Sequence, residues 1–192
     1  MIRFILHGGY TIEKNEQNDA FYKELSKYVP DGGNILLVYF SRKDEEVNKF
    51  FEDDKNRILE QAKGKKLVLT PASEENFMEQ VRHAHAVYFK GGSTEKLFAV
   101  LKRYPDFTKS IAGKVIAGDS AGAYVLAKYY YSVSSGKIGE GLGLLPVRVI
   151  CHYESPRFKW KNDPVLLMKQ YPDNLELIVF KDFEWRTFVQ SK

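Results

Sequence analysis

Compact apolar runs alternate with helix-like stretches along the chain up to residue 130. The runs occupy residues 2–6, 34–40, 66–70, 86–90 and 114–118. Between them, apolar residues recur at spacings of three and four, as in Leu97, Val100, Leu101 and Tyr104, which is typical of amphipathic helices. Apolar strands that are each followed by a helix favour a parallel sheet with helices on both faces. We therefore expect an α/β fold of three layers, of the flavodoxin-like kind, with a mostly parallel sheet.

The pattern changes after residue 131. Residues 121–130 continue a helical pattern, whereas residues 132–146 are rich in Gly and Ser and predict a loop or short hairpin. A strand is expected over 147–153, followed by a helix that begins with Asp163 and Pro164. Two apolar runs, 175–180 and 184–189, predict a closing hairpin across 181–183. With no linker, repeat or low-complexity segment, we expect one domain over residues 1–192.

Composition excludes several classes of protein. The net charge is +4, with acidic and basic residues interspersed, and aromatic and basic residues do not interleave as in binders of single-stranded nucleic acid. No apolar run is long enough to span a membrane, and the amino-terminal segment lacks a secretory cleavage pattern. The single cysteine, Cys151, cannot form an internal disulfide, which suits a reducing compartment. We expect a cytoplasmic protein, monomeric or homodimeric, that binds neither nucleic acid nor membrane.

The stretch GDSAG at residues 118–122 has the Gly-x-Ser-x-Gly pattern of a nucleophile elbow. In such an elbow a serine occupies a strained turn between strand and helix, so its neighbours must be small. Ser120 is placed in this way, with Gly118 and Gly122 on either side. The N–H of Ala121 would then face an oxyanion from the start of the following helix. The alternative is a plain strand-to-helix turn that uses small residues.

A second small-residue turn follows the run at 86–90. Gly91 and Gly92 precede a helix, and turns at the carboxyl ends of neighbouring parallel strands lie together. Either glycine could supply a second oxyanion donor beside Ser120. An anion site at the helix start, or a simple turn, remains the alternative.

A nucleophilic serine needs a base, and His152 is the best candidate. It follows an apolar strand and so belongs at a carboxyl end, whereas His83 and His85 precede a strand and belong at the opposite edge. The acidic residue that would complete a Ser-His-acid triad is less clear. Glu140 is the only acidic residue between Ser120 and His152; Glu154 and Asp119 are alternatives, and the site could lack an acid altogether.

Three blocks, FKGGSTEKLF, AGDSAGA and GLGLLPVRVICHYE, occur in order over residues 88–154. Together they resemble the dipeptidase E (aspartyl dipeptidase) and cyanophycinase family of serine peptidases. The chain also resembles esterases of the hormone-sensitive-lipase type through GDSAG and the HGG at 7–9. Too little chain follows Ser120 for the esterase topology, however, and HGG lies too far upstream.

The resemblance to dipeptidase E implies a fold like that of class I glutamine amidotransferase domains. It implies Ser120 as nucleophile, His152 as base, and N–H groups of Gly91 or Gly92 and of Ala121 as the oxyanion hole. It also implies an acid between the serine and the histidine. This chain has Ser135 near the place of the family's Asp, so either Glu140 substitutes for that residue or the triad is incomplete. The family's preference for an amino-terminal Asp implies a cation at the site, for which Arg148, Arg157 and Lys90 are candidates.

The expected function is hydrolysis of small peptides through an acyl-enzyme, without a metal or organic cofactor. The alternative is a catalytically weak binding or regulatory protein that keeps the elbow without the triad. A carboxylate within hydrogen-bond reach of His152 would favour the enzyme.

Overall fold

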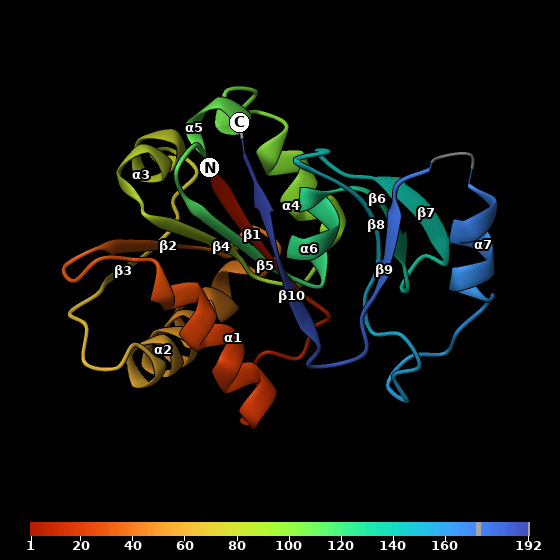
Figure 1. The fold of residues 1–192 in the computed structure, drawn as a ribbon, viewed down its shortest axis with the longest axis horizontal. Coiled ribbons are helices and arrows are strands. Elements are labelled where there is room, and N and C mark those ends of the chain that lie inside the picture. Colours follow the sequence, from red (N-terminus) through yellow and green to blue (C-terminus); the bar gives the residue numbers. More distant parts are fainter. Residues whose placement is uncertain (172–173, 192) are drawn as a thin grey trace.

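The structure is a computed structural model that describes residues 1–171 and 174–191. It contains a main sheet of strand order β10–β1–β5–β4–β2–β3 (Figure 1). The strands are β1 (Ile2–His7), β2 (Asn34–Val38), β3 (Val68–Pro71), β4 (Ala86–Phe89), β5 (Val115–Asp119) and β10 (Trp185–Gln190). All neighbouring strands are parallel except β10, which runs antiparallel to β1. The expected α/β fold with a mostly parallel sheet is confirmed.

Helices cover both faces of the main sheet. On one face lie α1 (Glu16–Lys27) and α2 (Asp44–Gln61), and on the other α3 (Phe77–His83), α4 (Thr94–Leu101), α5 (Phe107–Ser110) and α6 (Ala121–Leu126). Successive residues of β1 alternate between the two layers: Phe4 and Leu6 pack with α3–α6, whereas Ile5 packs with Phe21 of α1. This period of two explains why the strands appear in the sequence as continuous apolar runs.

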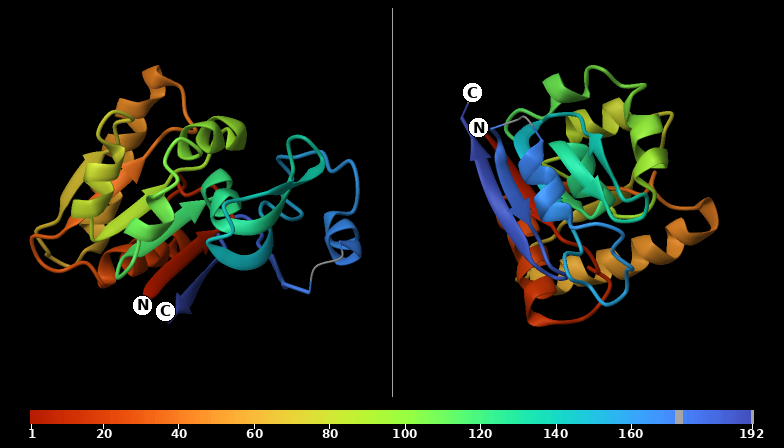
Figure 2. Two further views of the ribbon diagram at one scale, coloured as in Figure 1. Left: turned by 90° about the horizontal axis from the view of Figure 1, so that it is seen from above. Right: turned by 90° about the vertical axis from the view of Figure 1, so that its right-hand side faces the viewer.

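A second sheet lies beside the main one, as Figure 2 also shows. Its order is β7–β6–β8–β9, with β6 (Ala127–Ser132), β7 (Lys137–Glu140), β8 (Leu145–Ile150) and β9 (Glu176–Val179), and α7 (Pro164–Gln170) packs against β8 and β9. The short helix α6 contacts strands of both sheets and is buried throughout.

Two expectations about this region are wrong. The helix expected over 121–130 ends at Leu126, and the chain continues as β6, because the AKYYYS stretch can pair with β7 and β8. The runs 175–180 and 184–189 do not form a hairpin. Instead β9 pairs parallel with β8, whereas β10 pairs with β1 in the main sheet. Residues 181–183 therefore connect the two sheets.

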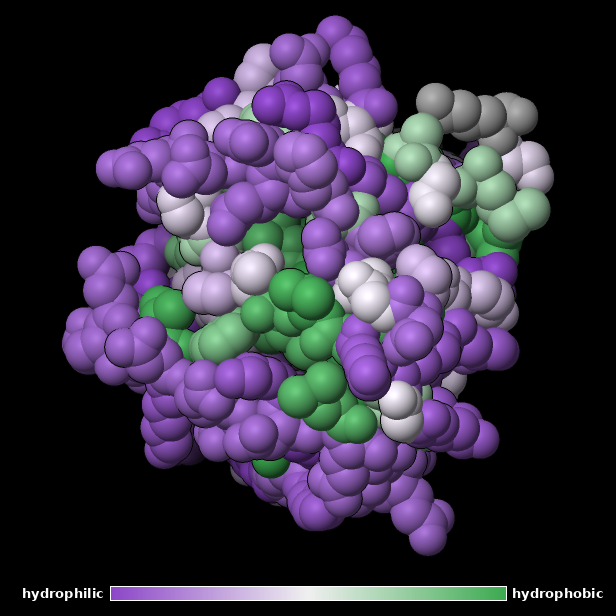
Figure 3. Space-filling model, turned by 90° about the vertical axis from the view of Figure 1, so that its left-hand side faces the viewer, coloured by the Kyte–Doolittle hydropathy of each residue, from purple (hydrophilic) through white to green (hydrophobic). Residues whose placement is uncertain are grey.

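One edge of the main sheet is β3, where Val68 is 49% exposed. Figure 3 views the molecule from the side on which β3 lies and shows hydrophobic atoms gathered at the middle of a hydrophilic surface. Within the described residues, no helix has both the length and the apolar composition that crossing a membrane requires.

Candidate active site

Ser120 lies at the turn between β5 and α6. Its backbone has φ 49° and ψ −108°, a conformation that costs energy for a residue with a side chain. The atoms around Gly118 and Gly122 leave no room for a side chain at either position. A Cβ on Gly118 would lie 2.4 Å from the carbonyl carbon of Gly122, and a Cβ on Gly122 would lie 2.1 Å from Phe89 O. The two glycines are therefore needed for close packing of strand and helix around the serine.

His152 reaches the serine hydroxyl. Its Nε2 lies 2.9 Å from Ser120 Oγ, and its side chain is 7% exposed. The residue follows β8, and its backbone N–H donates to Gly8 O at 3.2 Å. Gly9, at φ +119°, allows the ring to pack there, because a Cβ at this position would lie 2.0 Å from His152 Cε1. The structure thus brings Ser120 and His152 together at the carboxyl ends of β5 and β8.

The other ring nitrogen of His152 is held by Asp182, which the sequence did not single out. His152 Nδ1 lies 2.7 Å from Asp182 Oδ1. The second carboxylate oxygen accepts a hydrogen bond from Ser155 Oγ at 2.6 Å and lies 3.9 Å from an Arg157 guanidinium nitrogen. Asp182 belongs to the connection between β9 and β10. Because this segment was expected only as the turn of a closing hairpin, nothing in the sequence pattern directed attention to it.

Glu140 does not contact His152, which corrects the expectation that it would orient the imidazole. It lies at the end of β7 in the second sheet, and its exposed carboxylate pairs with Lys128 at 2.5 Å. The alternative Glu154 pairs with Lys181 at 2.7 Å, on the surface. The alternative Asp119 points toward β4, where its Oδ1 accepts hydrogen bonds from Tyr88 OH at 2.7 Å and from Gly91 N at 2.9 Å.

The Gly91–Gly92 turn lies next to the serine, as expected, but its two N–H groups differ. The Gly91 N–H donates to Asp119 and is therefore not available to a substrate. Ser41 Oγ donates to the carbonyl oxygens of Lys90 at 2.7 Å and Gly91 at 3.1 Å. Because a trans peptide holds its C=O and N–H on opposite sides, this contact directs the Gly92 N–H away from Ser41. Gly92 and Ala121 remain the candidate oxyanion donors.

A buried histidine shapes the β1–α1 turn against which His152 packs. His7 Nε2 lies 2.8 Å from Asn18 Oδ1, and His7 Nδ1 accepts the Gly9 N–H at 2.9 Å. Burial lowers the pKa of His7 to about 4. The ring is therefore neutral near pH 7, with its proton on Nε2, and it orders the turn rather than taking part in proton transfer with a substrate.

A cavity of about 300 Å³, here called the catalytic cavity, opens above the serine. Besides Ser120 and His152, its lining includes three aromatic rings and the cation Arg42; the rings are Tyr10, Phe50 and Phe158. The rings of Tyr10 and Phe158 lie 5.0 and 4.9 Å from that of His152.

The three cations expected to bind an acidic substrate side chain all have partners. Arg148 donates to the backbone carbonyls of Leu175 and Met168. Lys90 forms a buried ion pair with Asp54 at 2.6 Å. Arg157 pairs with Glu13 and lies over the Tyr10 ring.

Cys151 is fully buried between Ser120 and β1, and its Sγ lies 3.8 Å from His7 O. Burial raises the pKa of this thiol, which keeps it protonated and unreactive. Its role is to pack beside the serine.

Comparison with solved structures finds this fold in peptidases. A peptidase from an acI-B1 Actinobacterium is 22% identical and superposes with a TM-score of 0.71, covering 97% of this chain and 82% of that one. A putative peptidase E protein from Listeria monocytogenes EGD-e is 19% identical, with a TM-score of 0.65 and all of both chains covered. A search of curated proteins finds no match.

The model of peptidase family S51 matches residues 4–185. This range includes the turn at Ser120, the Gly91–Gly92 turn, His152 and Asp182, and the match confirms the resemblance to dipeptidase E that the three sequence blocks indicated. The chain belongs to peptidase family S51.

Proposed function

We propose that this chain is a serine peptidase of small peptides in which Ser120 is the nucleophile, His152 the base and Asp182 the residue that orients the base. The observation that carries the proposal is the hydrogen-bonded series from Ser120 Oγ to His152 Nε2 at 2.9 Å and from His152 Nδ1 to Asp182 at 2.7 Å. A nucleophile, a base and an orienting carboxylate in this order are what acyl transfer requires.

In the first half of the reaction, Ser120 Oγ attacks the scissile carbonyl carbon while its proton passes to His152 Nε2. The negative charge on the former carbonyl oxygen is stabilised by the N–H groups of Gly92 and Ala121. When the C–N bond breaks, Nε2 returns its proton to the leaving amine. Asp182 accepts a hydrogen bond from the Nδ1–H group throughout, remains ionised, and so stabilises the imidazolium.

In the second half, a water molecule replaces the amine. His152 Nε2 takes a proton from this water as its oxygen attacks the acyl carbon of the Ser120 ester. The C–O bond to Ser120 then breaks, and Ser120 Oγ regains the proton. The products are a carboxylic acid and the free enzyme.

The alternative function, binding without catalysis, required a histidine without a carboxylate. The Asp182 contact argues against it.

Arg42 suggests which peptides to test first: within the described residues it forms no ion pair, and its guanidinium stacks over the Phe50 ring at 4.1 Å in the wall of the catalytic cavity. An uncompensated cation there favours peptides with an acidic residue.

The test combines labelling and turnover. A fluorophosphonate probe should label the wild-type protein, and the label should be lost in Ser120→Ala and strongly reduced in His152→Ala. A dipeptide panel that includes Asp-Leu should show hydrolysis with the same dependence. If labelling and hydrolysis are absent, or persist in Ser120→Ala, the peptidase mechanism is wrong and the binding alternative is favoured.

A further inference from the structure

The order of strands in the main sheet fixes the order of site residues along its rim, the edge at which the parallel strands end. His152 packs against the turn after β1, Ser120 follows β5, Gly91 and Gly92 follow β4, and Arg42 follows β2. Beyond Arg42, the segment after β3 contains Glu74. The base thus lies at one end of this series and the β3 segment at the other.

This order gives a bound peptide a direction, if the chain acts as proposed above. The base must return its proton to the leaving amine, so the carboxyl-side residue lies at the His152 end of the rim. The acyl part of the substrate then extends the other way, over the turns after β4, β2 and β3. A dipeptide needs only the catalytic cavity, whereas a longer acyl part must pass Arg42.

A second cavity lies where such an acyl part would reach. It is an open cavity of about 580 Å³, lined by residues of α2, α4 and the segments after β2 and β3. Arg42 lines both this cavity and the catalytic cavity. Parallel α/β sheets bind ligands at the carboxyl ends of their strands. The second cavity, like the first, is lined by residues that follow such ends.

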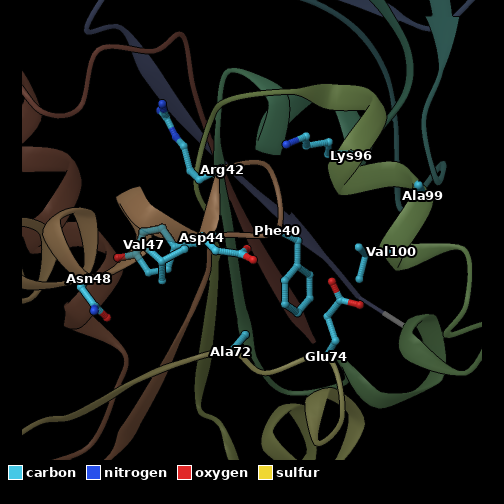
Figure 4. A pocket seen from close by; sticks show the side chains of 11 residues that line it. Phe40, Arg42, Asp44, Val47, Asn48, Ala72, Glu74, Lys96, Ala99 and Val100 are labelled. Atoms are coloured by element: carbon cyan, nitrogen blue, oxygen red, sulfur yellow. The ribbon is translucent and has the colours of Figure 1, made fainter.

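The lining suits the amino end of a peptide. Phe40 presents its ring to the cavity, and Val47 and Val100 extend the apolar surface. Figure 4 shows the carboxylates of Asp44 and Glu74 directed toward this ring from opposite sides, while the two cations of the lining, Arg42 and Lys96, extend away from the ring. Glu74 also pairs with Arg103, whereas Asp44 forms no ion pair within the described residues. Carboxylates beside an apolar surface complement an ammonium group next to an apolar side chain.

Strand spacing gives the length of peptide required. Adjacent strands lie about 4.8 Å apart, so β2 is about 10 Å and β3 about 15 Å from β5. An extended residue spans about 3.3 Å, so the cavity lies about three to four residues before the scissile bond. We propose that the second cavity binds the amino-terminal residue of an oligopeptide substrate, with its ammonium at Asp44 and Glu74 and an apolar side chain on Phe40.

The proposal is tested with peptides that share one scissile bond. Release of the final Leu is compared for Asp-Leu, Leu-Ala-Asp-Leu and N-acetyl-Leu-Ala-Asp-Leu, by mass spectrometry. Burying one apolar side chain should raise kcat/KM of the free tetrapeptide over the dipeptide at least about tenfold. Acetylation should remove a large part of this advantage, because it removes the ammonium charge. A tetrapeptide no better than the dipeptide would overturn the proposal.

Two variants locate the effect. Ala99 is exposed on α4 and faces the second cavity, so Ala99→Trp should fill it and abolish the tetrapeptide's advantage while Asp-Leu turnover stays unchanged. Asp44→Asn should reduce the difference between free and acetylated tetrapeptide. Lys102→Trp, exposed at the end of the same helix and outside the cavity, is the matched control and should keep the wild-type ratio. An advantage that survives Ala99→Trp would contradict the assignment.

Binding to the Ser120→Ala protein separates this inference from the proposed function. Calorimetry should show that Ser120→Ala binds the free tetrapeptide at least about tenfold more tightly than Asp-Leu, and that adding Ala99→Trp removes the difference. If the wild-type enzyme hydrolyses nothing but this difference is found, the peptidase mechanism fails and the binding site stands. If the enzyme hydrolyses Asp-Leu but Ser120→Ala binds the tetrapeptide no more tightly than Asp-Leu, the peptidase mechanism stands and the binding site at the second cavity is wrong.

Discussion

Asp182 completes the series of hydrogen bonds through His152, and its removal gives the most direct prediction at the scale of single residues. In Asp182→Asn the side chain keeps its size but loses the charge that stabilises the imidazolium. We expect kcat for a hydrolysed dipeptide to fall by about a hundred- to ten-thousandfold. Steady-state kinetics near pH 7.5 measure the change.

Glu140→Gln is the matched control, since it makes the same chemical change at the residue first expected to be the acid. Its exposed carboxylate contacts Lys128 on the second sheet, so kcat should stay within about twofold of wild type, as for other surface substitutions. A loss in Glu140→Gln with no loss in Asp182→Asn would reverse the assignment.

The residues of the site differed in how far the sequence revealed them. Ser120 was predictable because its strained turn requires Gly118 and Gly122, which leave a local motif. The position of His152 followed from the apolar strand before it. Asp182 needs only one hydrogen bond to the imidazole and imposes no requirement on its neighbours. Its role therefore depends on tertiary structure alone.

At the scale of elements, the turn after β2 holds the turn after β4. Ser41 Oγ bonds Lys90 O and Gly91 O, and Ser41 O accepts the Ser93 N–H at 2.9 Å. In Ser41→Ala the Gly91–Gly92 peptide loses this hold, so the Gly92 N–H is less well aligned with the oxyanion. Because the loss acts on the transition state, we expect kcat to fall about ten- to a hundredfold, less than the loss of a whole donor, with KM little changed.

Ser41→Thr tests whether the hydroxyl is what matters, because it keeps the hydroxyl and should retain more activity than the alanine variant. Ser110 lies on α5, and its Oγ donates to Asp106 O, so Ser110→Ala should leave kcat unchanged. A rise in KM with unchanged kcat in Ser41→Ala would indicate instead that Ser41 contributes to substrate binding.

The elements also show where prediction from sequence ends. The strands β1, β2, β4 and β5 are buried on both faces, and each therefore appears as an apolar run with a helix after it. Local composition identifies such strands. The apolar composition of the runs 175–180 and 184–189 also identifies them as strands. Composition does not identify their partners, β8 and β1, which lie far away in sequence. The short connection at 181–183 favoured a hairpin. Only the arrangement of the two sheets places the two strands in different sheets.

For the whole molecule, His7 makes stability depend on pH. Burial lowers its pKa to about 4 from 6.5 in the unfolded chain. Below pH 6.5 the unfolded state therefore binds a proton that the folded state does not, and the free energy of unfolding falls as pH decreases. The contribution is about 1.4 kcal/mol per pH unit down to the folded pKa, about 3 kcal/mol in total.

His7→Asn should remove this contribution. The free energy of unfolding, measured with urea from pH 7 to pH 4.5, should therefore fall less steeply than in wild type. His83→Asn is the control, because His83 is exposed on α3 and should leave the slope unchanged. Equal slopes for wild type and His7→Asn would mean that His7 is not neutral in the folded protein at these pH values.

In the proposed mechanism, the connection between β9 and β10 makes catalysis depend on the completed molecule. Ser120 is set by the main sheet, His152 follows a strand of the second, and Asp182 lies on the passage from one sheet to the other. A partly assembled chain, in which β10 has not yet joined β1, has its serine in place but a histidine without its anion. If the chain acts as proposed, a nascent or misfolded copy should therefore be latent, and turnover should return during refolding only once the two sheets are joined.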